Sequence, residues 1–69
     1  MTVTATCDYT AGGWPGALYT GEVKVSMNTD EGMERESIKE ELAIRARRKV
    51  AHDYAMTTAS VKITDVRIE

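Results

Sequence analysis

The sequence of 69 residues contains one cysteine, one histidine, one proline and one tryptophan, and it has no phenylalanine. A single thiol, Cys7, cannot form an internal disulfide, which is typical of a protein in the reducing cytosol. One histidine and one cysteine cannot supply the three or four ligands of a structural zinc site, and Asp30, Glu31 and Gly32 do not reproduce a calcium loop. We therefore predict a protein without a metal or other cofactor.

Long apolar stretches are absent as well. No run approaches the roughly 20 residues of a membrane span, and the segment MTVTATCDY lacks the basic and apolar regions of a signal peptide. We expect a cytoplasmic protein that has no membrane partner.

The overall balance is that of a small globular domain. Hydrophobic residues make up 42% and charged residues 29%, with a formal net charge of −2. We predict a single α+β domain over residues 1–69. A chain of this size buries only about 60% of the surface that its unfolded form exposes, so we expect a protein partner or self-association to add stability.

Catalysis has little support in this composition. A Cys–His nucleophile needs both side chains within hydrogen-bond reach in an open cleft, but Cys7 and His52 fall on different predicted elements and Cys7 falls on a buried face. The glycine-rich segment GGWPG is not a phosphate cradle, because Pro15 removes one amide and a strand follows instead of a helix. We predict that the protein is not an enzyme.

Two segments alternate as strands do. Residues 2–10 place Val3, Ala5, Cys7 and Tyr9 on one face and threonines with Asp8 on the other. Residues 17–27 continue the pattern, with Ala17, Tyr19, Val23, Val25 and Met27 inward. Gly21 interrupts this row, which is typical of a bulge or a close backbone approach. The loop between them predicts a β-hairpin.

A helix is predicted over residues 34–55. Apolar residues recur every four positions along it: Ile38, Leu42, Ala46, Val50 and Tyr54. Its start is open between Thr29 or Asp30 and Ser37, because Ser37 and Glu40 match a capping box.

The last strand, over residues 59–68, contains a phase break. Val61 and Ile63 fall on one face, whereas Val66 and Ile68 fall on the other. We expect a bulge near Thr64 and Asp65 that restores one buried face; the alternative is that both faces of its end are covered, one of them by a partner.

The order of elements is therefore β-β-α-β, and a right-handed crossover returns the last strand beside the first. This predicts a three-stranded antiparallel sheet in the order 2-1-3 with one helix across one face. The exposed edges of such a sheet favour pairing, so we expect a homodimer.

The helix separates its charges. The acidic residues of its N-terminal half and the preceding loop are Asp30, Glu31, Glu34, Glu36, Glu40 and Glu41, and its C-terminal half holds Arg45, Arg47, Arg48 and Lys49. This pattern complements the helix dipole, and Glu41–Arg45 and Lys49–Asp53 are spaced as ion pairs. It also predicts two binding surfaces: a cationic side made by Arg45, Arg48, Lys49 and His52, and an acidic one made by Asp30, Glu31 and Glu34.

The segment YTAGGWPGALYT places Trp14 in a turn between the two strands of the hairpin. Trp14 is either a lid over Tyr9 and Tyr19 or an exposed anchor for a partner, since Trp, Tyr and Arg are enriched at binding hot spots.

In general character the chain resembles the small phage-encoded anti-CRISPR and anti-defence inhibitors. The similarity lies in a solitary domain, slight acidity, the acidic stretch DEGMERESIKEE and the β-β-α-β order. The resemblance implies a non-catalytic protein that occludes a surface of a larger bacterial complex. The alternatives are a nucleic-acid binder that uses the cations of the helix, which the net negative charge disfavours, and an assembly subunit.

Overall fold

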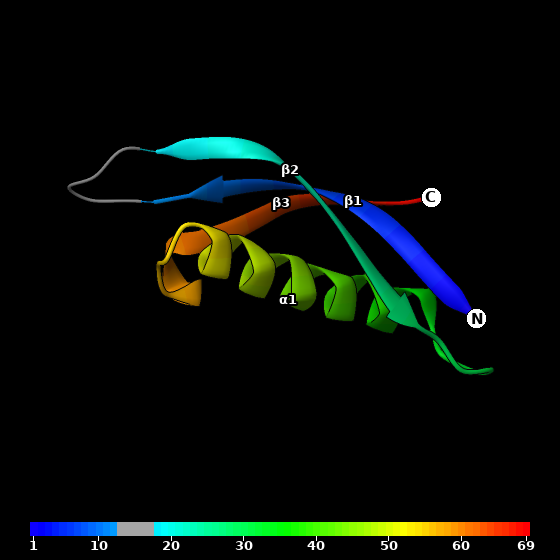
Figure 1. Cartoon of the computed structure of the whole chain (residues 1–69). Coiled ribbons are helices and arrows are strands. Elements are labelled where there is room, and N and C mark those ends of the chain that lie inside the picture. The colour runs from blue at the N-terminus through cyan, green and yellow to red at the C-terminus, as the bar shows by residue number, and fades with distance from the viewer. Residues whose placement is uncertain (13–17) are drawn as a thin grey trace.

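A computed structural model describes residues 1–12 and 18–69 of the chain. It contains the strands β1 (Thr2–Ala11), β2 (Tyr19–Asn28) and β3 (Val61–Ile68), the helix α1 (Arg35–Asp53), and a short 3₁₀ turn over Thr58–Ser60. The strands form one antiparallel sheet in the order β2-β1-β3, and α1 packs across one of its faces (Figure 1). The predicted α+β architecture and strand order are confirmed.

The alternating pattern of each strand decides which residues face the helix. Ala5, Cys7 and Ala11 of β1 are buried beneath α1, as are Val25 and Met27 of β2. The paired register Cys7 to Val23 and Ala5 to Val25 keeps these odd-numbered positions on one face throughout.

The expected bulge in β3 is present. Asp8 pairs with Asp65 but Tyr9 pairs with Ile63, so Thr64 is the extra residue. This single insertion returns the apolar residues on both sides of it to the helix-covered face, where Val61 is buried and Ile63, Val66 and Ile68 pack against the core.

The predicted apolar stripe of α1 forms the other half of the core. Leu42 and Ala46 pack with the central part of the sheet, while Val50 and Ala51 pack with Ala11 and Val61 near the C-terminal end of the helix. Two further apolar residues of the helix differ in burial: Ala51 is buried, but Ile44 is 43% exposed.

The helix confirms the predicted range of 34–55, but its start matches neither of the two alternatives, Thr29 or Asp30 and Ser37. Helical residues begin at Arg35 with Glu34 in the cap position, and no side chain caps this end. Ser37 therefore lies within the first turn, and the capping box does not mark the start. The packing of Ile38 and Leu42 on the sheet outweighs that local signal.

The helix ends in a hydrogen-bonded C-terminal motif. The amide of Met56 donates to the carbonyl of Ala51 (2.9 Å) and that of Ala55 donates to His52 (3.1 Å), which is the Schellman pattern. Ala55 adopts the left-handed conformation that this motif requires, with φ of 53°. Met56 then folds back onto the core.

Candidate protein-binding surfaces

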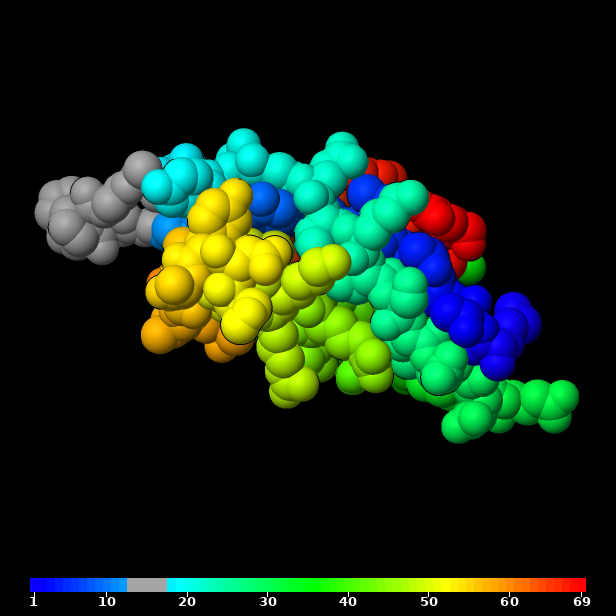
Figure 2. All heavy atoms as spheres, in the orientation of Figure 1, coloured from blue at the N-terminus to red at the C-terminus, as the bar shows by residue number. Residues whose placement is uncertain are grey.

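The molecule is elongated, measuring 44 × 17 × 17 Å along its principal axes. The loop between β2 and α1, which carries Asp30 and Glu31, protrudes at one end, and the start of β2 lies against the end of α1 toward the other (Figure 2). The 19 residues of α1 separate these regions by about 28 Å at 1.5 Å per residue. The predicted contact residues therefore form separate surfaces. Trp14 and Ala17 lie outside the described residues.

Three tyrosines from three elements meet near the hairpin end, and we call them the tyrosine cluster. Tyr19 of β2 stacks on Tyr54 at the end of α1, with ring centroids 4.9 Å apart. The Tyr54 hydroxyl lies 2.9 Å from the hydroxyl of Tyr9 on β1. Tyr19 faces the helix side, as predicted, but it remains 45% exposed, and Tyr54 is 37% exposed. The three side chains are therefore held together by stacking and by a hydrogen bond, and the cluster is also exposed to solvent.

Gly21 makes the position of Tyr9 possible. The two residues are paired across β1 and β2, and a Cβ at position 21 would lie 2.8 Å from the Tyr9 hydroxyl oxygen. The Tyr9 ring occupies the space that a side chain would fill. The register passes Gly21 without a bulge, and an aromatic side chain approaches it instead of the predicted backbone. The hydrogen bond to Tyr54, and then partial burial, raise the pKa of the Tyr9 phenol.

The acidic surface lies beside an apolar hollow at the opposite end. Asp30, Glu31 and Glu34 are exposed. Asp30 and Glu31 border a hollow of about 420 Å³ whose apolar lining includes Val3, Met33 and Ile38.

The predicted cationic side of α1 lies next to the outer edge of β2. The Arg45 guanidinium pairs with Glu41 at 3.3 Å, as the spacing predicted, and reaches the carbonyl of Ser26. Lys49 donates to the carbonyl of Lys24 at 3.2 Å. No Lys49–Asp53 ion pair forms between these described residues, because Lys49 turns toward the strand. Arg48 and His52 are exposed.

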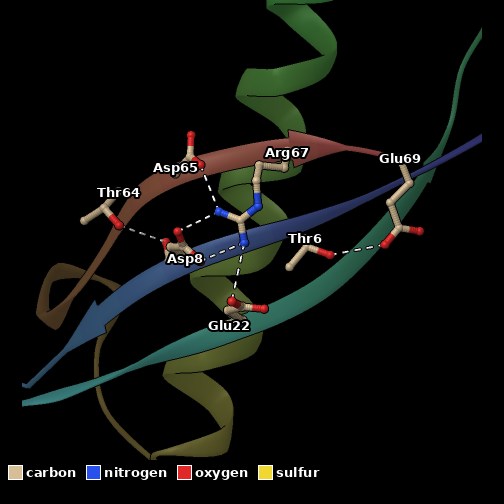
Figure 3. Close-up of polar contacts among 7 residues, drawn as sticks. All are labelled: Thr6, Asp8, Glu22, Thr64, Asp65, Arg67 and Glu69. Atoms are coloured by element: carbon tan, nitrogen blue, oxygen red, sulfur yellow. Dashed lines mark hydrogen bonds and ion pairs between the residues drawn. The ribbon is translucent and has the colours of Figure 1, made fainter.

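The open face of the sheet carries an ion network that the sequence analysis missed. The Arg67 guanidinium donates to both carboxylate oxygens of Asp8 (2.7 and 3.0 Å) and to Asp65 (2.9 Å), and it lies 3.6 Å from Glu22 (Figure 3). The hydrogen bonds from Arg67 lower the pKa of the Asp8 carboxyl. The alternation of each strand places both Asp8 and Arg67 on the open face of the sheet. This shared face is the feature of the sequence that could have indicated the ion pair.

The chemistry of Cys7 is that of a core residue. The thiol is fully buried between the sheet and α1, and desolvation raises its pKa. His52 lies in the last turn of α1 and is exposed. Over residues 1–12 and 18–69, no three side chains of the metal-binding types converge, and no helix there has the length and apolar character needed to cross a membrane.

Comparison of the chain with protein-family models, curated proteins and solved structures found no match.

Proposed function

We propose that this protein acts by binding and occluding a surface of a larger protein complex, as its likeness to phage-encoded inhibitors implies, and that it does so without catalysis. The tyrosine cluster is the observation that carries the proposal. It presents stacked aromatic surface that is already held in place, and tyrosine is among the residues enriched at binding hot spots. An aromatic surface fixed before binding loses little conformational entropy when a partner docks.

The charges favour a protein partner over a nucleic acid. Two of the four predicted cationic contacts, Arg45 and Lys49, already bond to carbonyls of β2. These two side chains are therefore less available to bind phosphates together with Arg48 and His52. The net charge of −2 further disfavours a polyanion.

The experiment compares two single substitutions at opposite ends of the molecule. Tyr54→Ala removes the residue that joins Tyr9 and Tyr19, and Met33→Ala removes a side chain that is equally exposed, at 37%. Each variant is titrated into purified CRISPR effector complexes, and both binding and inhibition of target-DNA recognition are measured. We expect Tyr54→Ala to weaken both by about tenfold or more, the range of a hot-spot residue, and Met33→Ala to leave them close to wild type.

The reverse result, loss with Met33→Ala alone, would transfer the contact to the acidic end. Failure of the unmodified protein to bind any of the complexes would contradict the proposed class of target. Tight, steeply salt-dependent binding to a labelled oligonucleotide would instead support the nucleic-acid alternative.

A further inference from the structure

The two edges of the sheet are treated differently. On the β2 edge, Arg45 and Lys49 cover the outward carbonyls of Ser26 and Lys24. On the β3 edge, no side chain among the described residues bonds to an outward backbone group. Natural sheets block edges that must not pair, so β3 is the edge left open to another strand.

The outward groups of β3 follow from its bonds to β1. The amide of Glu69 donates to Thr4, and the amide of Gly12 donates to Ser60. Alternation from these two ends directs the backbone groups of Ile63, Val66 and Ile68 away from β1. Because Thr64 is the extra residue of the bulge, Ile63 and Val66 are three positions apart instead of two.

This spacing favours one partner strand for β3. A regular strand can pair across the bulge only by leaving the extra residue unpaired, as β1 does on the other side. A second copy of β3 running antiparallel matches, because Ile63 then faces Val66 of the second copy and Val66 faces Ile63. The same two residues, Thr64 and Asp65, lie between these pairs on both strands.

The same register brings charges of both signs together. It places Lys62 directly opposite Arg67 of the second copy, a pair of like charges that is unfavourable by itself, and diagonal to Asp65 and Glu69 of that copy. Arg67 is already surrounded by Asp8, Asp65 and Glu22, so that group carries a net charge of −2, from one cation and three carboxylates. Lys62 therefore approaches a negative region.

The helices are complementary as well. A hollow of about 250 Å³ lies where α1 meets β3, lined by Ala43, Ile44 and Arg47 and by residues 61–63. A twofold axis through the bulge brings two copies of α1 together in antiparallel orientation on one side of a six-stranded sheet. The acidic first half of each helix then lies toward Arg47 of the other, which lines this hollow, and the exposed Ile44 is covered.

We propose that two copies of this chain pair through the outer edges of β3, with the twofold axis passing through the Thr64 bulge. This inference is independent of the proposed function, because the tyrosine cluster takes no part in the contact.

The test is the molar mass in solution, measured by sedimentation over a wide range of concentration. We expect a dimer of twice the 7.6 kDa chain, and we expect Lys62→Glu to raise its dissociation constant at least tenfold. Ile44→Ser should weaken it as well. The control is Arg48→Glu, the same charge reversal at an exposed position of α1 that does not line the hollow beside β3, and it should have little effect. Circular dichroism verifies that each variant is folded.

Amide hydrogen exchange identifies the edge directly. In the dimer, the amides of Ile63 and Val66 should be protected and should lose that protection on dilution, while the outward amides of Lys24 and Ser26 exchange at both concentrations. A monomer at every concentration would overturn the proposal. So would a dimer that protects the β2 amides or that is weakened by Arg48→Glu and not by Lys62→Glu.

Discussion

At the scale of the residue, Arg67 and Tyr54 each have several partners on elements that are distant in sequence. Arg67 joins all three strands through Asp8, Asp65 and Glu22. Tyr54 joins the end of the helix to both strands of the hairpin. Single side chains of this kind align elements whose apolar faces would tolerate small shifts.

The Arg67–Asp8 pair predicts a specific pH dependence. Hydrogen bonds from Arg67 lower the Asp8 pKa below its ordinary value of 3.8. The pair therefore adds stability that is complete above the ordinary pKa and is lost as the pH falls through the lowered one. Arg67→Gln should raise the Asp8 pKa toward its ordinary value, as measured by NMR titration of the carboxyl carbon. Lys62→Gln removes a cation elsewhere on β3, and an equal rise with that variant would contradict the assignment to Arg67.

Gly21 provides a second prediction at this scale. In Gly21→Ala, the new methyl group would meet the Tyr9 ring, so the ring must move and its hydrogen bond to Tyr54 should break. The Tyr9 pKa should then fall toward 10.0, which ultraviolet titration of the phenols can measure. Tyr54→Phe removes the same hydrogen bond without crowding Tyr9, and it should also lower the Tyr9 pKa. A Tyr9 pKa unchanged in both variants would show that the bond does not control it.

At the scale of the element, the end of α1 shows a conflict between residue type and backbone. Ala55 occupies a left-handed position where glycine has no steric penalty. The Schellman bonds and the burial of Met56 hold it there.

Ala55→Gly should therefore stabilise the fold by about 1 kcal/mol, because a Cβ in the left-handed region costs about 1–2 kcal/mol. In a domain of this size, that change corresponds to a rise in Tm of roughly 4–8 °C by thermal denaturation. The matched control is Ala43→Gly in the interior of the helix, which should lower Tm because glycine is about 1 kcal/mol worse than alanine there. A Tm that falls in both variants by the same amount would argue against a special role of position 55.

At the scale of the whole molecule, a thin core makes each buried residue costly to lose. Leu42 is fully buried and packs between the sheet and the helix. Leu42→Ala should cost about 2–5 kcal/mol. That is a large part of the roughly 3–10 kcal/mol expected for a domain of 69 residues.

Urea denaturation at a fixed low protein concentration should show Leu42→Ala unfolded or close to unfolding without denaturant. Ile44→Ala truncates an apolar side chain on the same helix that is 43% exposed. It should cost less than about 1 kcal/mol. Similar losses for the two variants would contradict the assignment of the core.

The sequence by itself determined the elements, their order and the face that each one buries. Alternation in β1, the four-residue spacing in α1 and the phase break at Thr64 are short-range patterns, and each element imposes its own period on its residues. The bulge was predictable because four apolar residues on two opposite faces need one extra residue to share a single core.

Only the tertiary structure decided which side chains from different elements meet. The stacking of Tyr19 on Tyr54, the network of Arg67 and the turning of Lys49 to the β2 edge depend on the strand register and on where the helix docks. These follow from the packing of the whole core, and no local period contains them. The contrast between a covered β2 edge and an open β3 edge arises in the same way, because a side chain can cover an edge only once the helix lies beside it.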